Sequence, residues 1–196
     1  SNHPVAATWM KNAAKQGVKI VLADPRVTGL GKHAWRTLQF KPDTDVAMLN
    51  ALIHTIIDED LVDQAFVRER AGNFEALKEN VKICGIDAQT LREVAREYAR
   101  PSGSAPGAAR GSMILWGMGI SQHVHGTDNA RCLIALATVA GQIGKPGSGL
   151  HPLRGQNNVQ GASDAGLIPM MFPNYQRVDQ PGAHAWFENF WASELD

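Results

Sequence analysis

The segment from residue 154 to residue 161 (RGQNNVQG) concentrates side chains suited to ligand recognition. One guanidinium stands among four primary amides, and these groups belong to Arg154, Gln156, Asn157, Asn158 and Gln160. An arginine can hold a carboxylate through two parallel hydrogen bonds, and amides donate and accept without titrating near neutral pH. The same composition is typical of an Asx-rich surface turn. The segment therefore predicts recognition of a planar or anionic ligand, or else a solvated turn.

A second candidate follows an apolar run at residues 18–23 (VKIVLA), which we expect to form a strand. Ligands of parallel α/β sheets bind outside the carboxyl ends of the strands. There, Asp24 could bind ribose hydroxyls or the amine edge of a purine, and Arg26 could bind a phosphate. An N-cap aspartate beside a surface arginine is the alternative. The sequence has neither a G-x-G-x-x-G nor a G-x-x-x-x-G-K-[ST] motif, so a nicotinamide Rossmann site or a P-loop is unsupported.

The third candidate is the segment 117–125 (GMGISQHVH). Its glycines allow a backbone to approach a ligand closely, and Met118 and Gln122 could contact that ligand. His123 and His125 lack a third ligand at a metal-binding spacing. The chain's two cysteines are too few for a disulfide framework, a zinc site or an iron–sulfur cluster. We therefore predict that this chain has no metal site and that its two cysteines are reduced.

Helical periodicity and capping residues predict the elements that position these segments. Thr44 and Asp87 are expected N-caps of the two longest helices in the middle of the chain. The run at 18–23 is almost wholly apolar, so we expect a strand buried on both faces. The expected elements are helices at 4–16, 45–58 and 87–100, short helices after Asp63 and around 74–81, and a second strand at 37–40.

The second half of the chain is expected to be less regular. Residues 101–112 lack any large apolar side chain and predict a loop. A strand at 113–116, with a glycine-punctuated strand end at 117–120, should precede a helix that Thr127 or Asp128 caps and that ends near Gln142. The body of that helix, residues 132–140, is apolar all round, so we expect the helix to be buried centrally. Residues 150–181 show no periodicity, and the remainder is an aromatic, amphipathic tail.

The expected fold class is α/β: a small, mostly parallel sheet with helices on both faces. Residues 1–181 are expected to form a single core that carries the loop at 101–112, and residues 182–196 the tail.

Composition excludes several classes of protein. The 196 residues are 44% hydrophobic, and 19 basic residues balance 19 acidic ones. A nucleic-acid-binding protein would be expected to carry a broad basic face. No apolar run reaches the length of a membrane helix, so we expect no membrane insertion. The first residues show no signal peptide, which favours the cytoplasm. They also lack an initiator methionine, so we expect a fragment of a longer protein.

The three candidate segments together resemble the catalytic subunit of molybdenum- or tungsten-dependent formate dehydrogenases. These enzymes belong to the bis-molybdopterin guanine dinucleotide oxidoreductases. The most specific likeness is residues 149–162 (GLHPLRGQNNVQGA), supported by residues 21–26 (VLADPR), 41–45 (KPDTD), 117–123 (GMGISQH) and 141–146 (GQIGKP). The order and spacing of these motifs fit the family over about residues 3–181.

The resemblance implies a role for each matched position. Asp24, Arg26 and Asp45 would contact guanine dinucleotide arms, and Met118, Gln122 and Gln156 would approach the pterins. Arg154 would be the catalytic residue that holds formate. The implied reaction is the reversible oxidation of formate to carbon dioxide, with electrons passed to iron–sulfur or NAD-linked domains or subunits of the parent protein.

The sequence also departs from the family pattern. The cysteine or selenocysteine that ligates the metal is expected upstream of this chain, and neither Cys84 nor Cys132 takes that place. Asp43 stands where glycine is expected, and Ser163 where some members carry cysteine. The loop at 101–112 is also longer than expected. We therefore expect the chain alone to be inactive and to bind no cofactor. The alternatives are a non-catalytic nucleotide-binding module and another bis-pterin oxidoreductase, such as a nitrate reductase.

Overall fold

The computed structural model describes residues 3–70, 85–100 and 111–195. The chain divides into two compact units, Ser1–Leu153 and Arg154–Asp196. The expected division of the chain into a core of residues 1–181 and a tail of residues 182–196 stays a prediction. Each unit is described by itself below.

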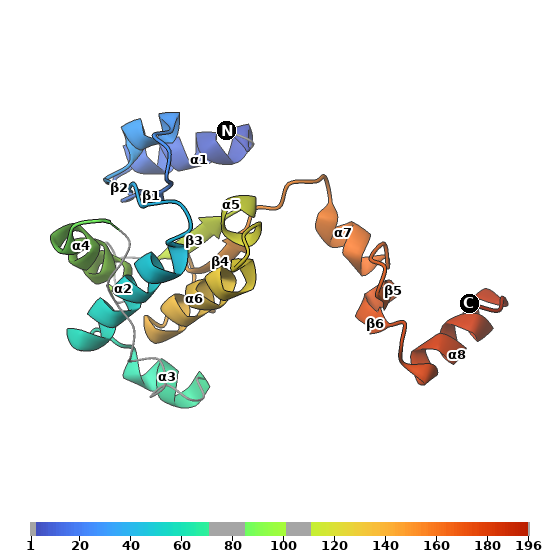
Figure 1. Cartoon of the computed structure of the whole chain (residues 1–196). Coiled ribbons are helices and arrows are strands. Elements are labelled where there is room, and N and C mark those ends of the chain that lie inside the picture. Colours follow the sequence, from blue (N-terminus) through green and yellow to red (C-terminus); the bar gives the residue numbers. More distant parts are fainter. Residues whose placement is uncertain (1–2, 71–84, 101–110, 196) are drawn as a thin grey trace. The chain divides into compact units, whose positions relative to one another are not determined.

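The first unit alternates helices with short strands (Figure 1). Its elements in chain order are α1 (Pro4–Lys15), β1 (Val21–Ala23), η1 (Gly29–His33), β2 (Arg36–Leu38), α2 (Asp45–Asp58), α3 (Gln64–Arg70), α4 (Ala88–Tyr98), β3 (Met113–Trp116), α5 (Met118–Ser121), α6 (Gly126–Val139) and β4 (Gly149–Pro152).

The strands of this unit form two parallel pairs, β1 with β2 and β3 with β4. Both strands of each pair end at the same edge, because Ala23 lies opposite Leu38 and Trp116 opposite Pro152. The α/β class and the parallel pairing are thereby confirmed. The structure has separate two-stranded pairs where one sheet was expected, and each strand in them has only three or four residues.

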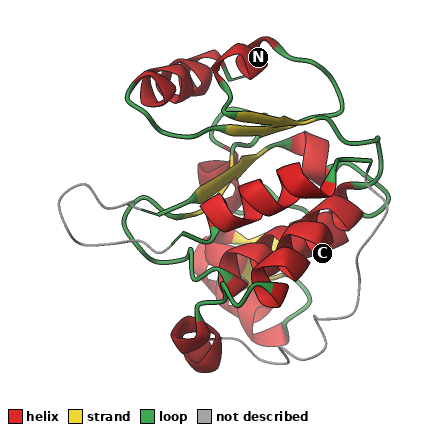
Figure 2. Cartoon of the chain, turned by 90° about the vertical axis from the view of Figure 1, so that its left-hand side faces the viewer, coloured by secondary structure: helices red, strands yellow, loops and turns green. Residues whose placement is uncertain are grey.

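The buried core of the first unit lies where α2 packs against α4 and α6. Figure 2 shows the chain from its side, with helices in red beside the short strands in yellow. Ile56 and Ala95 are fully buried, and Leu136 is 3% exposed. Helix α2 has the predicted bounds, and its apolar stripe faces this core. At the N-terminus of α4, the Asp87 side chain accepts a hydrogen bond from the Thr90 N–H, as an N-cap does.

Three local expectations for the first unit were wrong. The run at 18–23 is not buried on both faces: only residues 21–23 pair as a strand, and Val18 is 57% exposed. Residues 117–120 do not extend β3, because the Ile120 and Gln122 N–H groups close helical turns onto Gly117 and Met118. Helix α6 begins at Gly126, before the expected caps, and its Ile134 is 51% exposed, so one side of it is uncovered.

The second unit has regular elements where a long loop was expected. Local hydrogen bonds form short elements there, and such bonds leave no periodic pattern in the sequence. Strand β4 also lies partly in the expected loop. The elements are α7 (Val159–Asp164), β5 (Met171–Phe172), η3 (Pro173–Tyr175), β6 (Gln176–Arg177) and α8 (Pro181–Trp191).

The aromatic tail forms helix α8 (Figure 1). Phe187 is buried, and its ring lies 4.6 Å from the ring of Phe172. Trp186 and Phe190 stack on each other at 5.0 Å and are more than half exposed. The helix expected around 74–81 and most of the loop at 101–112 lie outside the described residues.

Candidate ligand-binding site

The carboxyl edge of the β1–β2 pair brings two polar segments together. The Asp24 N–H donates to the Leu38 carbonyl at 3.2 Å, which extends the pairing by one residue. The Gln39 side-chain amide then donates to the Pro25 carbonyl at 3.1 Å. Asp24 and Arg26 therefore stand at the edge of the parallel pair where ligands of α/β proteins bind.

Asp24 and Arg26 share one tight turn. The Arg26 backbone N–H donates to Asp24 Oδ1 at 2.8 Å, and the Arg26 Nε lies 3.5 Å from the same oxygen. The Asp24 side chain is 24% exposed, whereas that of Arg26 is 85% exposed. The turn thus orients the carboxylate and leaves the guanidinium in solvent, where it can meet an anion.

Asp45 stands in the first turn of α2 and is 3% exposed. Thr44 precedes the helix as expected, but its hydroxyl donates to the Lys41 carbonyl at 2.7 Å and does not cap the helix. Within the described part of the chain, no hydrogen bond or ion pair reaches the Asp45 carboxylate. A carboxylate at a helix N-terminus is stabilised by the helix dipole. It can also accept hydrogen bonds from the N–H groups of a purine edge.

The segment after β3 is tied to the segment before α2. The His123 Nε2 lies 2.6 Å from the Gly119 carbonyl oxygen, and its Nδ1 lies 3.6 Å from Asp43 Oδ1. Met118, in the same segment, is 43% exposed, and Gln122 ends the short helix α5. The carboxyl ends of β2 and β3 therefore lead into segments that contact each other.

Asp43 adopts a left-handed backbone with φ +66°. This explains why glycine is the residue expected from the family pattern, since glycine takes this conformation without steric cost. Aspartate tolerates it better than most residues do. The glycine expected at this position was a signal for the conformation, and the sequence analysis did not use it. The contact with His123 has no signal in the sequence, so it was missed.

The two histidines of the 117–125 segment do not form part of a metal cluster. Across residues 3–70, 85–100 and 111–195, no group of three or more His, Cys, Asp or Glu side chains could hold a metal ion. Cys132 is half-buried, its thiol lies 3.7 Å from Asn50 Oδ1, and burial raises the pKa of that thiol. Cys84 lies outside the described residues.

The remaining candidates, Arg154 and Gln156, belong to the second unit and are exposed. Arg154 has φ +59°, and Asn158 has φ +52°. Asn158 caps α7, because its Oδ1 accepts from the Gly161 N–H at 3.3 Å. A Cβ on Gly161 would lie 2.5 Å from Asn158 Nδ2, so only glycine fits beside this cap. The RGQNN segment is thus a defined, locally strained turn.

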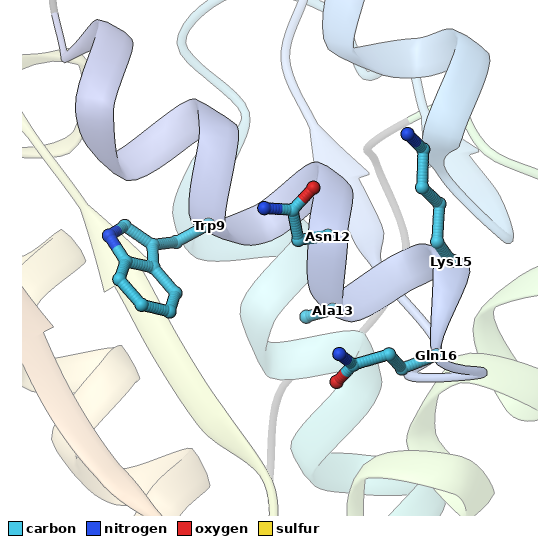
Figure 3. A pocket seen from close by; sticks show the side chains of 5 residues that line it. All are labelled: Trp9, Asn12, Ala13, Lys15 and Gln16. Atoms are coloured by element: carbon cyan, nitrogen blue, oxygen red, sulfur yellow. The ribbon is translucent and has the colours of Figure 1, made fainter.

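A hollow beside α1 holds none of the predicted site residues (Figure 3). Its lining side chains come from that helix and from its C-cap, Gln16, and include Trp9, which is 73% exposed. None of them was singled out by the sequence as a candidate site residue. The described helices are also too short or too polar to cross a membrane.

Comparison with known proteins identifies the family. Residues 1–187 match the protein family described as Molybdopterin oxidoreductase. The chain belongs to the molybdopterin oxidoreductase family. The family part of the resemblance seen in the sequence is thereby confirmed.

Curated relatives are named formate dehydrogenases. The F420-dependent formate dehydrogenase subunit alpha of Methanocaldococcus jannaschii is 40% identical over 99% of this chain and 29% of its own length. Formate dehydrogenase H of Escherichia coli is 38% identical over 98% of this chain and 27% of its own length. The chain therefore spans less than a third of these relatives.

A solved structure supports the fold. Acetylene hydratase from Pelobacter acetylenicus superposes with a TM-score of 0.58 at 28% identity. The superposition covers 67% of this chain and 18% of the hydratase chain. The likeness confirms the α/β core. The name of the hydratase also shows that this core occurs in a protein named for another reaction.

Proposed function

We propose that this chain is part of the catalytic subunit of a molybdenum- or tungsten-dependent formate dehydrogenase. The observation that carries the proposal is the identity of about 40% to formate dehydrogenase alpha subunits along 99% of the chain. The motifs around Arg154 and Asp24 are the ones from which the family was inferred. Fold alone would not select this reaction, because one fold hosts many chemistries.

The residues at the strand edge fit a bis-molybdopterin guanine dinucleotide cofactor. Asp45, which is 3% exposed, supplies a carboxylate at the N-terminus of α2, and Asp24 supplies an oriented one, and both can accept from a guanine edge. Arg26 supplies an exposed cation for a phosphate. We assign Asp24, Arg26 and Asp45 to the nucleotide arms on this donor chemistry.

Met118, Gln122 and Gln156 are assigned to the pterin part of the cofactor. Gln122 and Gln156 can donate to and accept from a pterin ring without changing charge. Met118 offers a polarisable thioether that is 43% exposed. When bound, the cofactor supplies the redox chemistry that accepts the electron pair of formate and hands it to iron–sulfur clusters of the intact enzyme.

Arg154 is assigned to the substrate. Its guanidinium can hold the formate carboxylate by two charge-assisted hydrogen bonds, worth about 1.5–3 kcal/mol for a bond to a charged group. The larger effect is orientation, because a fixed carboxylate directs the C–H bond, and positioning of reactants can account for several kcal/mol of a barrier. The other domains or subunits that receive the electrons, and the cytoplasmic location, belong to the same proposal.

The test is the replacement of Arg154 in the full-length enzyme. Arg154→Lys keeps the charge but loses the planar fork, and Arg154→Ala loses both. Formate turnover should fall by orders of magnitude, with lysine less damaging than alanine, while metal and pterin content stay unchanged. Arg177→Ala is the matched control, because it removes an exposed arginine of the same unit that pairs locally with Asp179.

Two outcomes would contradict the assignment. Full formate oxidation by Arg154→Ala would remove the substrate role. Loss of metal together with activity would make Arg154 a structural residue of the loop. Assaying nitrate on the same preparations separates the formate dehydrogenase from the nitrate reductase alternative.

A further inference from the structure

Two consecutive residues of the second unit have a left-handed backbone. Asn174 has φ +59° and Tyr175 has φ +58°. Asparagine takes this conformation fairly readily, but a bulky side chain such as tyrosine does so rarely. Backbone strain of this kind persists where surrounding contacts hold it, and it clusters at functional sites. The contacts that hold the turn therefore indicate what it supports.

The Tyr175 side chain joins this turn to helix α7. Its hydroxyl accepts from the Gln160 side-chain amide at 3.0 Å. The same amide donates to Asp164 Oδ1 at 3.1 Å. A hydrogen bond to the Asp164 carboxylate is the main reason that the pKa of Tyr175 is raised. Two side chains of α7 and one from the turn thus form a polar cluster.

The backbones of the turn and the helix also meet directly. Gly166 follows α7 with φ +83°, and a Cβ there would lie 2.6 Å from the Pro173 nitrogen. The C-terminal end of α7 therefore packs against the beginning of the turn. The hydroxyl of Tyr175 and this close approach together fix the helix on the turn.

The opposite end of α7 carries the segment that the proposed function uses. Asn158 caps the helix, and the side chain of this cap leaves no room for a Cβ on Gly161. Arg154 and Gln156 precede the cap by only a few residues, and Arg154 itself has a left-handed backbone. Asn158 is both the cap of α7 and the last residue of this segment. Because α7 has only six residues, a shift of the helix moves the segment with it.

We propose that Tyr175 is a positioning residue, whose hydroxyl anchors α7 through Gln160 and Asp164 and thereby holds the Arg154–Asn158 segment in place. The inference rests on the proposed roles of Arg154 and Gln156. Tyr175 itself touches neither substrate nor cofactor in this account. It acts through the helix.

The first arm of the test needs no activity. Tyr175→Phe removes the hydroxyl and keeps the ring. Amide hydrogen exchange at residues 159–164 of the whole chain should become about fivefold to tenfold faster, the factor that corresponds to one net hydrogen bond in a local opening equilibrium. Exchange in α2 and α6 should not change. Unchanged exchange at 159–164 would overturn the anchoring.

The chain offers a matched control in its other tyrosine. The Tyr98 hydroxyl is buried and has no hydrogen-bond partner among the described residues. Tyr98→Phe makes the same chemical change and should leave exchange at 159–164 as it was. Asp164→Asn keeps an acceptor for the Gln160 amide that links the helix to Tyr175, so it should rescue most of the effect of Asp164→Ala. Equal damage from both Asp164 variants would overturn the hydrogen-bonded cluster as the cause.

The second arm uses the full-length enzyme. Tyr175→Phe should raise the KM for formate several-fold with metal content retained, and Tyr98→Phe should not. An unchanged KM alongside faster exchange would overturn the positioning role. Arg154→Ala, assayed in parallel, tests the proposed substrate role of Arg154 separately. If that variant oxidises formate normally, the substrate role of Arg154 fails and the positioning role of Tyr175 fails with it, whatever the exchange shows.

Discussion

Asp63 contacts three segments of the first unit. Its Oδ1 accepts from the Phe66 N–H at 3.0 Å, and its Oδ2 lies 2.9 Å from the Lys145 ammonium. Its own N–H donates to the Val139 carbonyl at 2.9 Å. These contacts fasten the start of α3 to the end of α6 and to the loop before β4.

We predict that Asp63→Ala lowers the free energy of unfolding by about 1–2 kcal/mol, the range for loss of an N-cap, since the partly exposed ion pair adds little. Asp63→Asn keeps the acceptor for Phe66 and should cost less.

The hydrogen bonds from Phe66 and Lys145 lower the pKa of Asp63 below its ordinary value of 3.8. Its contribution is therefore present above about pH 4 and is lost as the pH falls through the lowered value.

Urea unfolding at neutral pH and at successively lower pH checks this prediction. The wild type and Asp63→Ala should differ at neutral pH, and the difference should shrink in acid. A difference that grows as the pH falls would contradict the assigned direction of the pKa shift.

At the scale of elements, the sequence predicted what periodicity and caps encode. Helix α2 was predicted with its observed bounds because its apolar residues repeat at helical spacing. The Asp87 cap of α4 and the Asp63 cap of α3 were predicted from residue type and position. Among the short elements that were missed, α5 and α7 have four and six residues, too few to show a period.

Burial of the elements was predicted less well, because it depends on tertiary neighbours. The strand run at 18–23 is apolar on both faces, yet Val18 is 57% exposed. The body of helix α6 is apolar all round, yet it buries Leu136 and leaves Ile134 exposed. Composition identifies which residues can be buried, and the packing of α2 against α6 decides which of them are buried.

The core between α2, α4 and α6 yields an element-scale prediction. Ile56→Ala should cost about 2–5 kcal/mol, because the side chain is fully buried and its removal leaves a cavity. Ile134→Ala is the matched control: it deletes the same atoms from a position that is 51% exposed and should cost less than about 1 kcal/mol. Chemical denaturation measures the free energy of unfolding of both variants. Equal losses would contradict a core between α2, α4 and α6.

For the whole molecule, part of the candidate site was predictable and part was not. The position of Asp24 and Arg26 at the end of a strand was predictable, because the apolar run of residues 18–23 ends directly before Asp24. The burial of Asp45 and the contact between Asp43 and His123 depend on how segments distant in the sequence pack, which no local pattern records. The roles assigned to the site residues came from the family motifs, and they stay predictions.

The distribution of buried apolar residues leads to the last prediction. The core cluster runs from Leu38 to Ala140, entirely within the first unit. In the second unit, Phe187 is the only buried hydrophobic residue among those described. A chain truncated after Leu153 should therefore unfold cooperatively, with a free energy within about 1 kcal/mol of the whole chain, because stability follows buried apolar area. Circular dichroism and urea unfolding of the two chains make the comparison. A loss of several kcal/mol on truncation would show that residues after Leu153 support the first unit, contrary to the distribution of its core.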